Sequence, residues 1–192
     1  MIKKFIYLIQ YSFIFFLLFL NSAYSADVTI TGTQTTREDL QADSTLTIQS
    51  GGSLVNTNLN NIARGYISAG NEIDGATIVV ESNASIEGKS NAIMGRETNN
   101  LTITNSGTIT VSSSKAINLR DSQNTTITNK KGATISANTN AIVQQSVGTE
   151  NAENVTISNS GTISSVENRS IYFYDGATGT TLTNNSSGVI FN

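Results

Sequence analysis

The stretch Asn100-Leu101-Thr102-Ile103-Thr104-Asn105 decides the fold of this chain, because it recurs twice with little change. It returns as Asn124-Thr125-Thr126-Ile127-Thr128-Asn129 and as Asn154-Val155-Thr156-Ile157-Ser158-Asn159. A Gly and a second Thr-Ile or Ala-Thr-Ile segment follow each copy within a few residues. Self-similarity at a spacing of roughly two dozen residues is typical of stacked solenoids, so the sequence predicts a repeat protein.

Within each copy, apolar residues alternate with Thr or Ser, as Ile103 does with Thr102 and Thr104. A period of two is typical of a β-strand with one face in the core and one face in water. Because Thr is β-branched, it favours extended backbone while keeping the outer face soluble. The pattern therefore predicts Ile inside and Thr outside.

Six repeats can be aligned, each with two strands joined by a turn of Ser, Asn and Gly. The central apolar residues of the first strands are Ile48, Val80, Ile103, Ile127, Ile157 and Leu182, and those of the second strands are Leu54, Ile86, Ile109, Ile135, Ile163 and Ile190. The turn residues Gly and Asn are expected to adopt positive φ. Stacking at ~4.8 Å would bring Asn105, Asn129, Asn159 and Asn184 into a ladder of side-chain amides.

A third apolar strand follows in the four middle repeats. These third strands are Ala92–Met94, Ala116–Leu119, Ala141–Val143 and Ser170–Phe173. Three short strands in each repeat, no Pro, and no long segment with helical periodicity predict an all-β fold. We expect a parallel β-helix solenoid of about six rungs.

The first 25 residues are predicted to be a secretory signal peptide. Two lysines precede an apolar run over residues 5–20, and Ala23 and Ser25 supply the small residues that signal peptidase needs. Cleavage is expected after Ser25, with cleavage after Ala26 as the second choice. An uncleaved anchor helix is the alternative, because the apolar run approaches the ~20 residues needed to span a bilayer.

The rest of the chain divides into two predicted regions. Residues 26–44 match the repeat poorly and contain the charged stretch 36–40, so they are predicted to form an N-terminal cap. Residues 45–192 are predicted to form the β-helix repeats, with an enlarged first repeat at Asn56 to Asp74 and an incomplete last one. In the enlarged repeat, Ile62, Ile67 and Ile73 are predicted to be buried.

Charge and composition exclude several classes of partner and scaffold. Without residues 1–25, nine Lys and Arg remain against fourteen Asp and Glu, a net charge of −5, and the charges are scattered along the sequence. Such a surface repels phosphate backbones and offers no Lys/Arg stripe, so we expect no nucleic-acid partner and no membrane insertion after signal cleavage. The absence of Cys excludes a disulfide scaffold and a lipid anchor.

No catalytic, cofactor-binding or metal-ligating residue is predicted, and no enzymatic activity is expected. The chain has no His, which excludes Ser-His-Asp and Cys-His catalysis and His-ligated metal sites. The acidic pairs Glu72/Asp74 and Glu150/Glu153 fall in loops between rungs, where solvated acids are ordinary.

Two copies of Asp-Gly-Ala-Thr, beginning at Asp74 and Asp175, are interpreted as turns rather than calcium sites. Each precedes the first strand of a rung, and neither stands in a Gly-Gly-x-Gly-x-Asp array. The Asn-x-Ser/Thr triplets at Asn100, Asn124 and Asn154 are products of the repeat, so they do not argue for glycosylation.

The few aromatic residues include Tyr172, Phe173 and Tyr174 in one strand. Alternation predicts that Ile171 and Phe173 point inward and that Tyr172 and Tyr174 point outward. Exposed tyrosines can stack on sugars or anchor a protein partner. The alternative is ordinary edge-strand surface.

The segments Thr-Ile-Thr-Asn-Ser-Gly-Thr-Ile (102–109) and Thr-Ile-Ser-Asn-Ser-Gly-Thr-Ile (156–163), with a leader peptide, resemble the passenger regions of bacterial autotransporters. The resemblance covers most of residues 45–192. It implies a right-handed parallel β-helix, carried to the cell surface by a C-terminal barrel, and a role as an adhesin or virulence factor. Nothing after Asn192 could form that barrel, so we expect a truncated or split passenger, or a stand-alone surface or periplasmic protein.

The sequence thus predicts an exported, non-enzymatic β-helical repeat protein of the periplasm, cell surface or extracellular space. Its expected role is surface interaction, with a host or cell-surface protein or a glycan as partner. Two alternatives are a secreted β-helix that binds or cleaves carbohydrate, and an inactive remnant of a longer autotransporter. Carboxylates and a Lys or Arg converging on one face would favour an enzyme.

Overall fold

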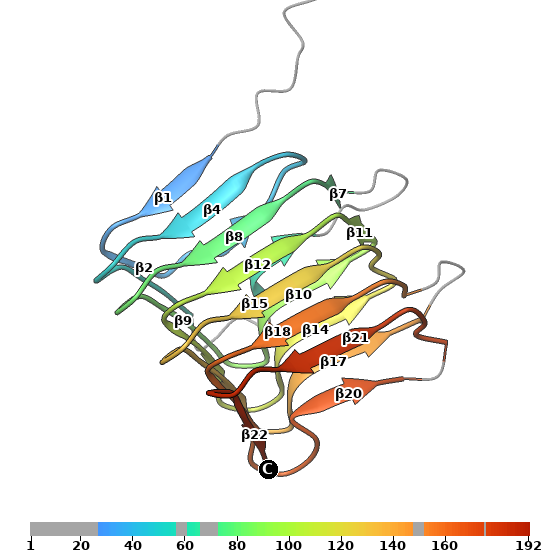
Figure 1. The fold of residues 1–192 in the computed structure, drawn as a ribbon. Helices are drawn as coiled ribbons and strands as arrows, with labels where there is room; N and C mark the ends of the chain where they lie inside the picture. Colours follow the sequence, from blue (N-terminus) through green and yellow to red (C-terminus); the bar gives the residue numbers. More distant parts are fainter. Residues whose placement is uncertain (1–26, 57–60, 66–72, 148–151, 175) are drawn as a thin grey trace, which may run out of the picture.

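The computed structural model describes residues 27–56, 61–65, 73–147, 152–174 and 176–192, and for residues 61–65 it describes the backbone alone. Within these residues all regular structure is β-strand, and three parallel sheets run side by side along the axis of the stack (Figure 1). No helix among the described residues is long and apolar enough to cross a membrane. The predicted signal peptide, residues 1–25, lies outside the described residues.

Each turn of the chain contributes one strand to each sheet, except that the last described turn has strands only in sheets A and B. In spatial order among the described residues, sheet A contains β1 (Val28–Ile30), β4 (Thr45–Ile48), β8 (Thr77–Val80), β12 (Thr102–Asn105), β15 (Thr126–Asn129), β18 (Thr156–Asn159) and β21 (Thr181–Asn184). Sheet B contains β2 (Thr33–Gln34), β5 (Ser53–Asn56), β9 (Ser85–Gly88), β13 (Thr108–Val111), β16 (Thr134–Ala137), β19 (Thr162–Ser165) and β22 (Val189–Phe191). Sheet C contains β3 (Glu38–Asp39), β6 (Asn61–Gly65), β10 (Asn91–Arg96), β14 (Lys115–Arg120), β17 (Asn140–Gln145) and β20 (Ile171–Phe173).

A short additional pair, β7 (Ile73–Asp74) and β11 (Thr98–Asn99), lies at the corner between sheets C and A. These elements and their parallel pairing confirm the predicted β-helix, including its third strands.

The core is a continuous column of aliphatic side chains enclosed by the three sheets. In β15, Ile127 is fully buried and Thr126 is exposed, and the same alternation runs through the middle strands of sheets A and B. The predicted assignment of Ile to the inside and Thr to the outside is confirmed. Since each buried Ile contributes only ~1.5–3 kcal/mol, one rung alone could not fold, and stacking has to supply the rest.

The predicted alignment of first strands is right from Ile48 to Val80 and from Ile103 to Leu182, and it is wrong only at the step from Val80 to Ile103. Ile103 pairs with Ile127 below it, but above it Ile103 pairs with Ile78 rather than Val80. Val80 instead stands over Asn105. A shift of two residues keeps every side chain on the same face of a strand, so hydrophobic alternation alone could not detect the error.

The region predicted as a cap follows the path of the repeats. Its strands β1, β2 and β3 pair in parallel with β4, β5 and β6, and Leu40 is buried in the core. It forms a terminal turn at the N-terminal end of the stack. In the enlarged first repeat, Ile73 is buried as predicted, whereas Ile67 and the side chain of Ile62 lie outside the described residues.

The predicted asparagine ladder is present and runs through the interior. The side-chain amide of Asn105 donates to the side-chain oxygen of Asn129 at 2.9 Å, and Asn129 donates to Asn159 at 2.8 Å. Asn159 donates to Asn184 at 2.8 Å, so Asn184 completes the series. The first three members are fully buried, which makes the ladder a polar stripe inside an apolar column.

A second column explains why the repeat begins with Asn. In six rungs, the residue two positions before the sheet A strand has a positive φ, and these residues are Asp43, Gly75, Asn100, Asn124, Asn154 and Gly179. Gly, Asn and Asp are the residues that best tolerate this left-handed conformation. The Asn-x-Ser/Thr triplets therefore follow from a backbone requirement at this corner.

The glycines of the turns between sheets A and B serve two different purposes. Gly51 and Gly132 have φ of +82°, as predicted for such turns. Gly107 and Gly161 do not have a positive φ, so the prediction is wrong for these two glycines. A Cβ on Gly107 would lie 2.2 Å from the carbonyl oxygen of Ala84, so this glycine is required by the close approach of the preceding rung.

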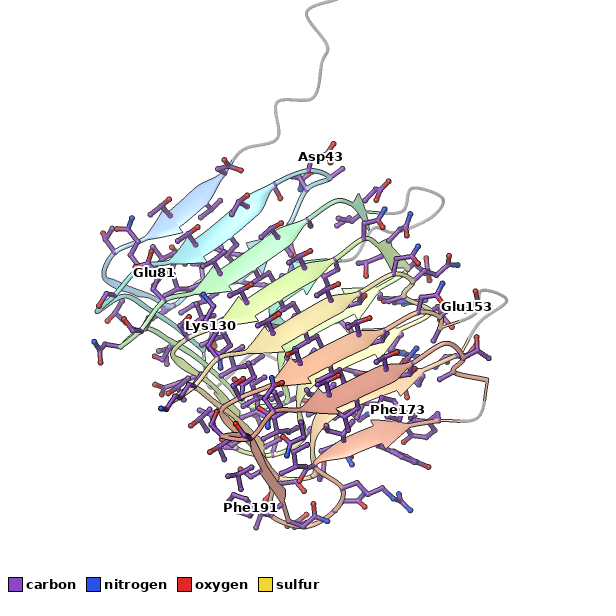
Figure 2. All side chains as sticks on the ribbon, viewed as in Figure 1. Asp43, Glu81, Lys130, Glu153, Phe173 and Phe191 are labelled. Atoms are coloured by element: carbon purple, nitrogen blue, oxygen red, sulfur yellow. The ribbon has the colours of Figure 1, made fainter. Side chains whose placement is uncertain are left out.

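The C-terminal end of the stack is open to solvent. Leu182 pairs with the fully buried Ile157 but is itself 43% exposed, and Phe191 is 53% exposed. Figure 2 shows Phe191 at the bottom of the stack, on the last strand of sheet B. A depression of about 480 Å³ lies between Ile171, Leu182 and Ile190, where the interior of the solenoid meets water.

Candidate functional site

The outer faces of the three sheets differ in chemistry. In β12, β15 and β18 of sheet A, the outward positions carry only Thr and Ser. The corresponding strands β13, β16 and β19 of sheet B are similar. In sheet C, the side chains outside the core cluster differ from rung to rung, with Met94, Asn118, Val143 and Tyr172 in one column and Arg96, Arg120 and Gln145 in the next. Sheet C is therefore the face that offers a distinctive binding surface.

The cations of the chain gather on this sheet. Of the nine Lys and Arg that follow residue 25, seven lie in a sheet C strand or within two residues of one, and they are Arg37, Arg64, Lys89, Arg96, Lys115, Arg120 and Arg169. Strands β10, β14, β17 and β20 contain no acid. The expectation of scattered charge without a Lys/Arg cluster is wrong, because stacking makes Arg96 and Arg120 register partners in adjacent strands.

Lys115 and Arg120 form the centre of this cluster, at the two ends of β14. Both are half-buried, and neither forms an ion pair with a described carboxylate. Burial and, secondly, the positive charge of Arg120 lower the pKa of Lys115 from its ordinary value of 10.5. The Nε of Arg120 is buried and has no hydrogen-bond partner among the described atoms. The two cations thus stand at opposite ends of one strand, and neither forms an ion pair with a described carboxylate.

A short chain of amides crosses the same face. Gln145 donates from Nε2 to the side-chain oxygen of Asn118 at 3.2 Å, and Asn118 donates from Nδ2 to the side-chain oxygen of Asn91 at 3.3 Å. Asn91 and Asn118 are buried, whereas Gln145 is half-buried. These bonds hold the side chains beside Lys115 and Arg120 in fixed positions across three rungs.

The aromatic cluster lies on the next rung. The guanidinium carbon of Arg169 stands 4.3 Å from the ring centre of Tyr172, and the rings of Tyr172 and Tyr174 are 4.1 Å apart with an interplanar angle of 46°. Tyr172 is half-buried and Tyr174 is 38% exposed. Tyr172 pairs with Val143, which lies outside the core cluster, so the two tyrosines share the outer face as predicted.

Phe173 departs from its predicted burial. It is 37% exposed although its register partner Gln144 is fully buried (Figure 2). The alternation placed Phe173 on the inner side of the strand, but β20 is the edge strand of sheet C. Among the described strands it has a neighbour on one side only, so an inward side chain still meets water.

We call the outer surface made by Lys115, Arg120, Gln145, Tyr172 and Tyr174, with Arg169 above Tyr172 and the buried Asn118 bonded to Gln145, the sheet C patch. The tyrosines were found from the sequence, whereas Lys115 and Arg120 were missed. Aligning the third strands would have found Arg120, because Arg96 and Arg120 occupy the same position in successive rungs, whereas Lys115 aligns with Asn91 and Asn140.

The acidic residues do not join this patch to form a metal cluster. No three His, Cys, Asp or Glu residues gather within the part of the chain that the structure describes. Arg96 Nε contacts Glu97 Oε1 at 3.1 Å, and Asp121 accepts a hydrogen bond from the backbone N–H of Val147 at 2.6 Å. Glu72 and Glu150, members of the two acidic pairs noted in the sequence, lie outside the described residues.

The two Asp-Gly-Ala-Thr segments occupy different places in the repeat. In the first, Gly75 has φ of +72°, and Asp74 accepts a hydrogen bond from the side chain of Asn100 at 2.7 Å. In the second, Gly176 has φ of +88° but lies three residues before Gly179, which is the counterpart of Gly75. Asp175 lies outside the described residues. Both glycines are turn residues, as predicted.

Comparisons with known proteins add no relative. No protein-family model, no curated protein and no solved structure matches this chain.

Proposed function

We propose that this chain is an exported, non-enzymatic β-helix that acts by binding a surface partner through the sheet C patch. The leader sequence and the autotransporter-like repeats support export to the periplasm, the cell surface or the extracellular space. The predicted adhesin-like role belongs to the same proposal.

The contrast between the faces carries the proposal. Thr and Ser repeated along sheets A and B satisfy strand propensity and solubility, and they give a partner little to distinguish. The sheet C patch instead combines unpaired cations, positioned amides and tyrosines. Arg and Tyr are the residues that most often dominate binding energy at interfaces.

Site-directed blocking tests this assignment. The chain has no Cys, so a single introduced Cys is a unique attachment point for a bulky maleimide–polyethylene glycol. We would attach it at Tyr174→Cys on the patch and, as a matched control, at Thr126→Cys on the exposed face of sheet A. Binding of each labelled protein to intact bacterial and epithelial cells is then measured by flow cytometry.

The expected result is loss of cell binding for the conjugate at position 174 and retention for the conjugate at position 126. Equal binding by the two conjugates would refute the patch as the interaction surface. Export is tested separately by fractionating expressing cells and treating them with an external protease. Finding the intact chain confined to the cytoplasm would refute the exported role.

A further inference from the structure

We infer that the sheet C patch binds an acidic polysaccharide, with an anionic group of one sugar between Lys115 and Arg120 and a neighbouring ring stacked on Tyr174. The inference rests on the proposed function, since it names the class of ligand for the same surface.

The charges point to an anionic ligand. Acids outnumber bases after residue 25, yet Lys115 and Arg120 have no carboxylate partner among the described residues. Two cations on the same strand repel each other, and an anion bound between them turns that repulsion into attraction. The guanidinium group of Arg120 and the ammonium group of Lys115, both half-buried, supply charge-assisted hydrogen bonds for a carboxylate or a sulfate.

The aromatic cluster points to a ring. Arg169 and Tyr172 hold each other in a cation–π contact, and Tyr172 in turn supports the tilted ring of Tyr174. Tyr174 is therefore a positioned and exposed aromatic surface rather than a freely rotating side chain. Such a surface suits the apolar face of a pyranose, and its hydroxyl group adds a polar contact at the edge.

The spacing suits a linear chain of sugars. Arg120 pairs with Gln145, and the backbone N–H of Tyr174 bonds to Gln144 O at 2.9 Å, so the cation and the ring lie two strands apart. Neighbouring strands are ~4.8 Å apart, which puts them about 10 Å from each other along the stack. The half-buried amide of Gln145 lies between them and offers hydrogen bonds to sugar hydroxyl groups.

Calorimetry with defined sugars tests the inference. The purified full chain would be titrated with oligogalacturonate, sulfated dextran, neutral dextran and inorganic polyphosphate, at low and high salt. The test variants are Lys115→Gln/Arg120→Gln and Tyr174→Ala. The control is Lys130→Gln/Lys131→Gln, which removes the same charge from the exposed turn between β15 and β16 (Lys130 is labelled in Figure 2).

We expect at least one of the two acidic sugars to bind and neutral dextran not to bind. Losing two charge-assisted contacts should weaken binding by about tenfold or more in Lys115→Gln/Arg120→Gln. The control should bind as the unchanged protein does, and salt should weaken binding. Comparing oligogalacturonate with sulfated dextran identifies the carboxylate or the sulfate as the preferred group.

Three outcomes would overturn the inference. The first is equal binding of acidic sugar by the charge variant and the control. The second is binding of polyphosphate as tight as that of the sugars and unaffected by Tyr174→Ala, which would show attraction to charge alone. The third is no binding of any sugar while position 174 conjugation still blocks cell binding, which would leave the proposed function standing and indicate a protein ligand.

Discussion

The buried asparagine ladder gives the sharpest test of how this solenoid is held together. Asn129 is at its centre, is fully buried and makes three side-chain hydrogen bonds. Its Nδ2 donates to the side-chain oxygen of Asn159 at 2.8 Å and to the backbone oxygen of Thr162 at 3.1 Å, and its Oδ1 accepts from Asn105 at 2.9 Å. The substitution Asn129→Ala removes all three bonds.

The expected cost follows from the partners left behind. Each bond contributes a net ~0.5–1.5 kcal/mol, so three bonds together contribute about 3 kcal/mol. The neighbouring asparagines limit the penalty, because Asn105 still donates to Thr134 O and the side-chain oxygen of Asn159 still accepts from the N–H of Gly161. Stability of a typical domain is only ~5–15 kcal/mol, so a loss of this size is readily measured.

Equilibrium unfolding in urea, followed by circular dichroism, is the assay. The matched control is Asn184→Ala, at the last position of the same ladder, where the exposed side chain donates to Gly188 O and accepts from Asn159, which still donates to Val189 O in the variant. Water can replace those contacts, so the control should lose less than ~1 kcal/mol. Equal losses in the two variants would refute the idea that the buried ladder, rather than asparagine in the turn, stabilises the stack.

Three further predictions concern the core, the turns and the sheet C patch. Ile127→Asn should lower the free energy of unfolding by about 4 kcal/mol, whereas Thr126→Asn should be nearly neutral, and equal urea midpoints would contradict the inside/outside assignment. Gly107→Ala should lower the free energy of unfolding by about 3 kcal/mol or more, because the added Cβ meets backbone oxygens. Gly132→Ala should lower it by only about 1 kcal/mol, because the space there is open and only the positive φ is strained. Thermal unfolding that ranks the two variants in the reverse order would contradict this prediction. Because the pKa of Lys115 is lowered in the folded state, the unfolded state binds more protons between that pKa and 10.5, so stability should rise with pH there. Lys115→Gln should abolish that rise in urea titrations at successive pH values, and an unchanged pH profile would exclude Lys115 as its cause.

Much of the fold could be predicted because the recurring segment shows the length of the repeat directly in the sequence. Alternation in Thr102 to Asn105 fixes which face is buried, and the recurrence of that segment fixes which strands stack. Alignment failed where the repeat is degenerate: Val80 and Ile103 are both aliphatic and both buried, yet they belong to different columns. Periodicity of two cannot separate positions two residues apart.

The candidate site was less predictable, because its members are distant in sequence. Lys115 and Tyr174 appear unrelated in the sequence, and nothing local indicates that β14 and β20 lie on one sheet with one strand between them. The tyrosines were recognised because they are adjacent in one strand. The cations were overlooked because a net negative charge describes the whole chain and not one of its faces.

By itself, the sequence determined the class of fold, the inner and outer faces of each strand and the asparagine ladder, because these depend on local alternation and on the identity of repeated residues. The tertiary structure decided the register between β8 and β12, the role of glycines such as Gly107 and the gathering of cations on sheet C. Those features depend on which atoms of neighbouring rungs meet. Contacts between rungs two dozen or more residues apart exist only once the chain has wound into its stack.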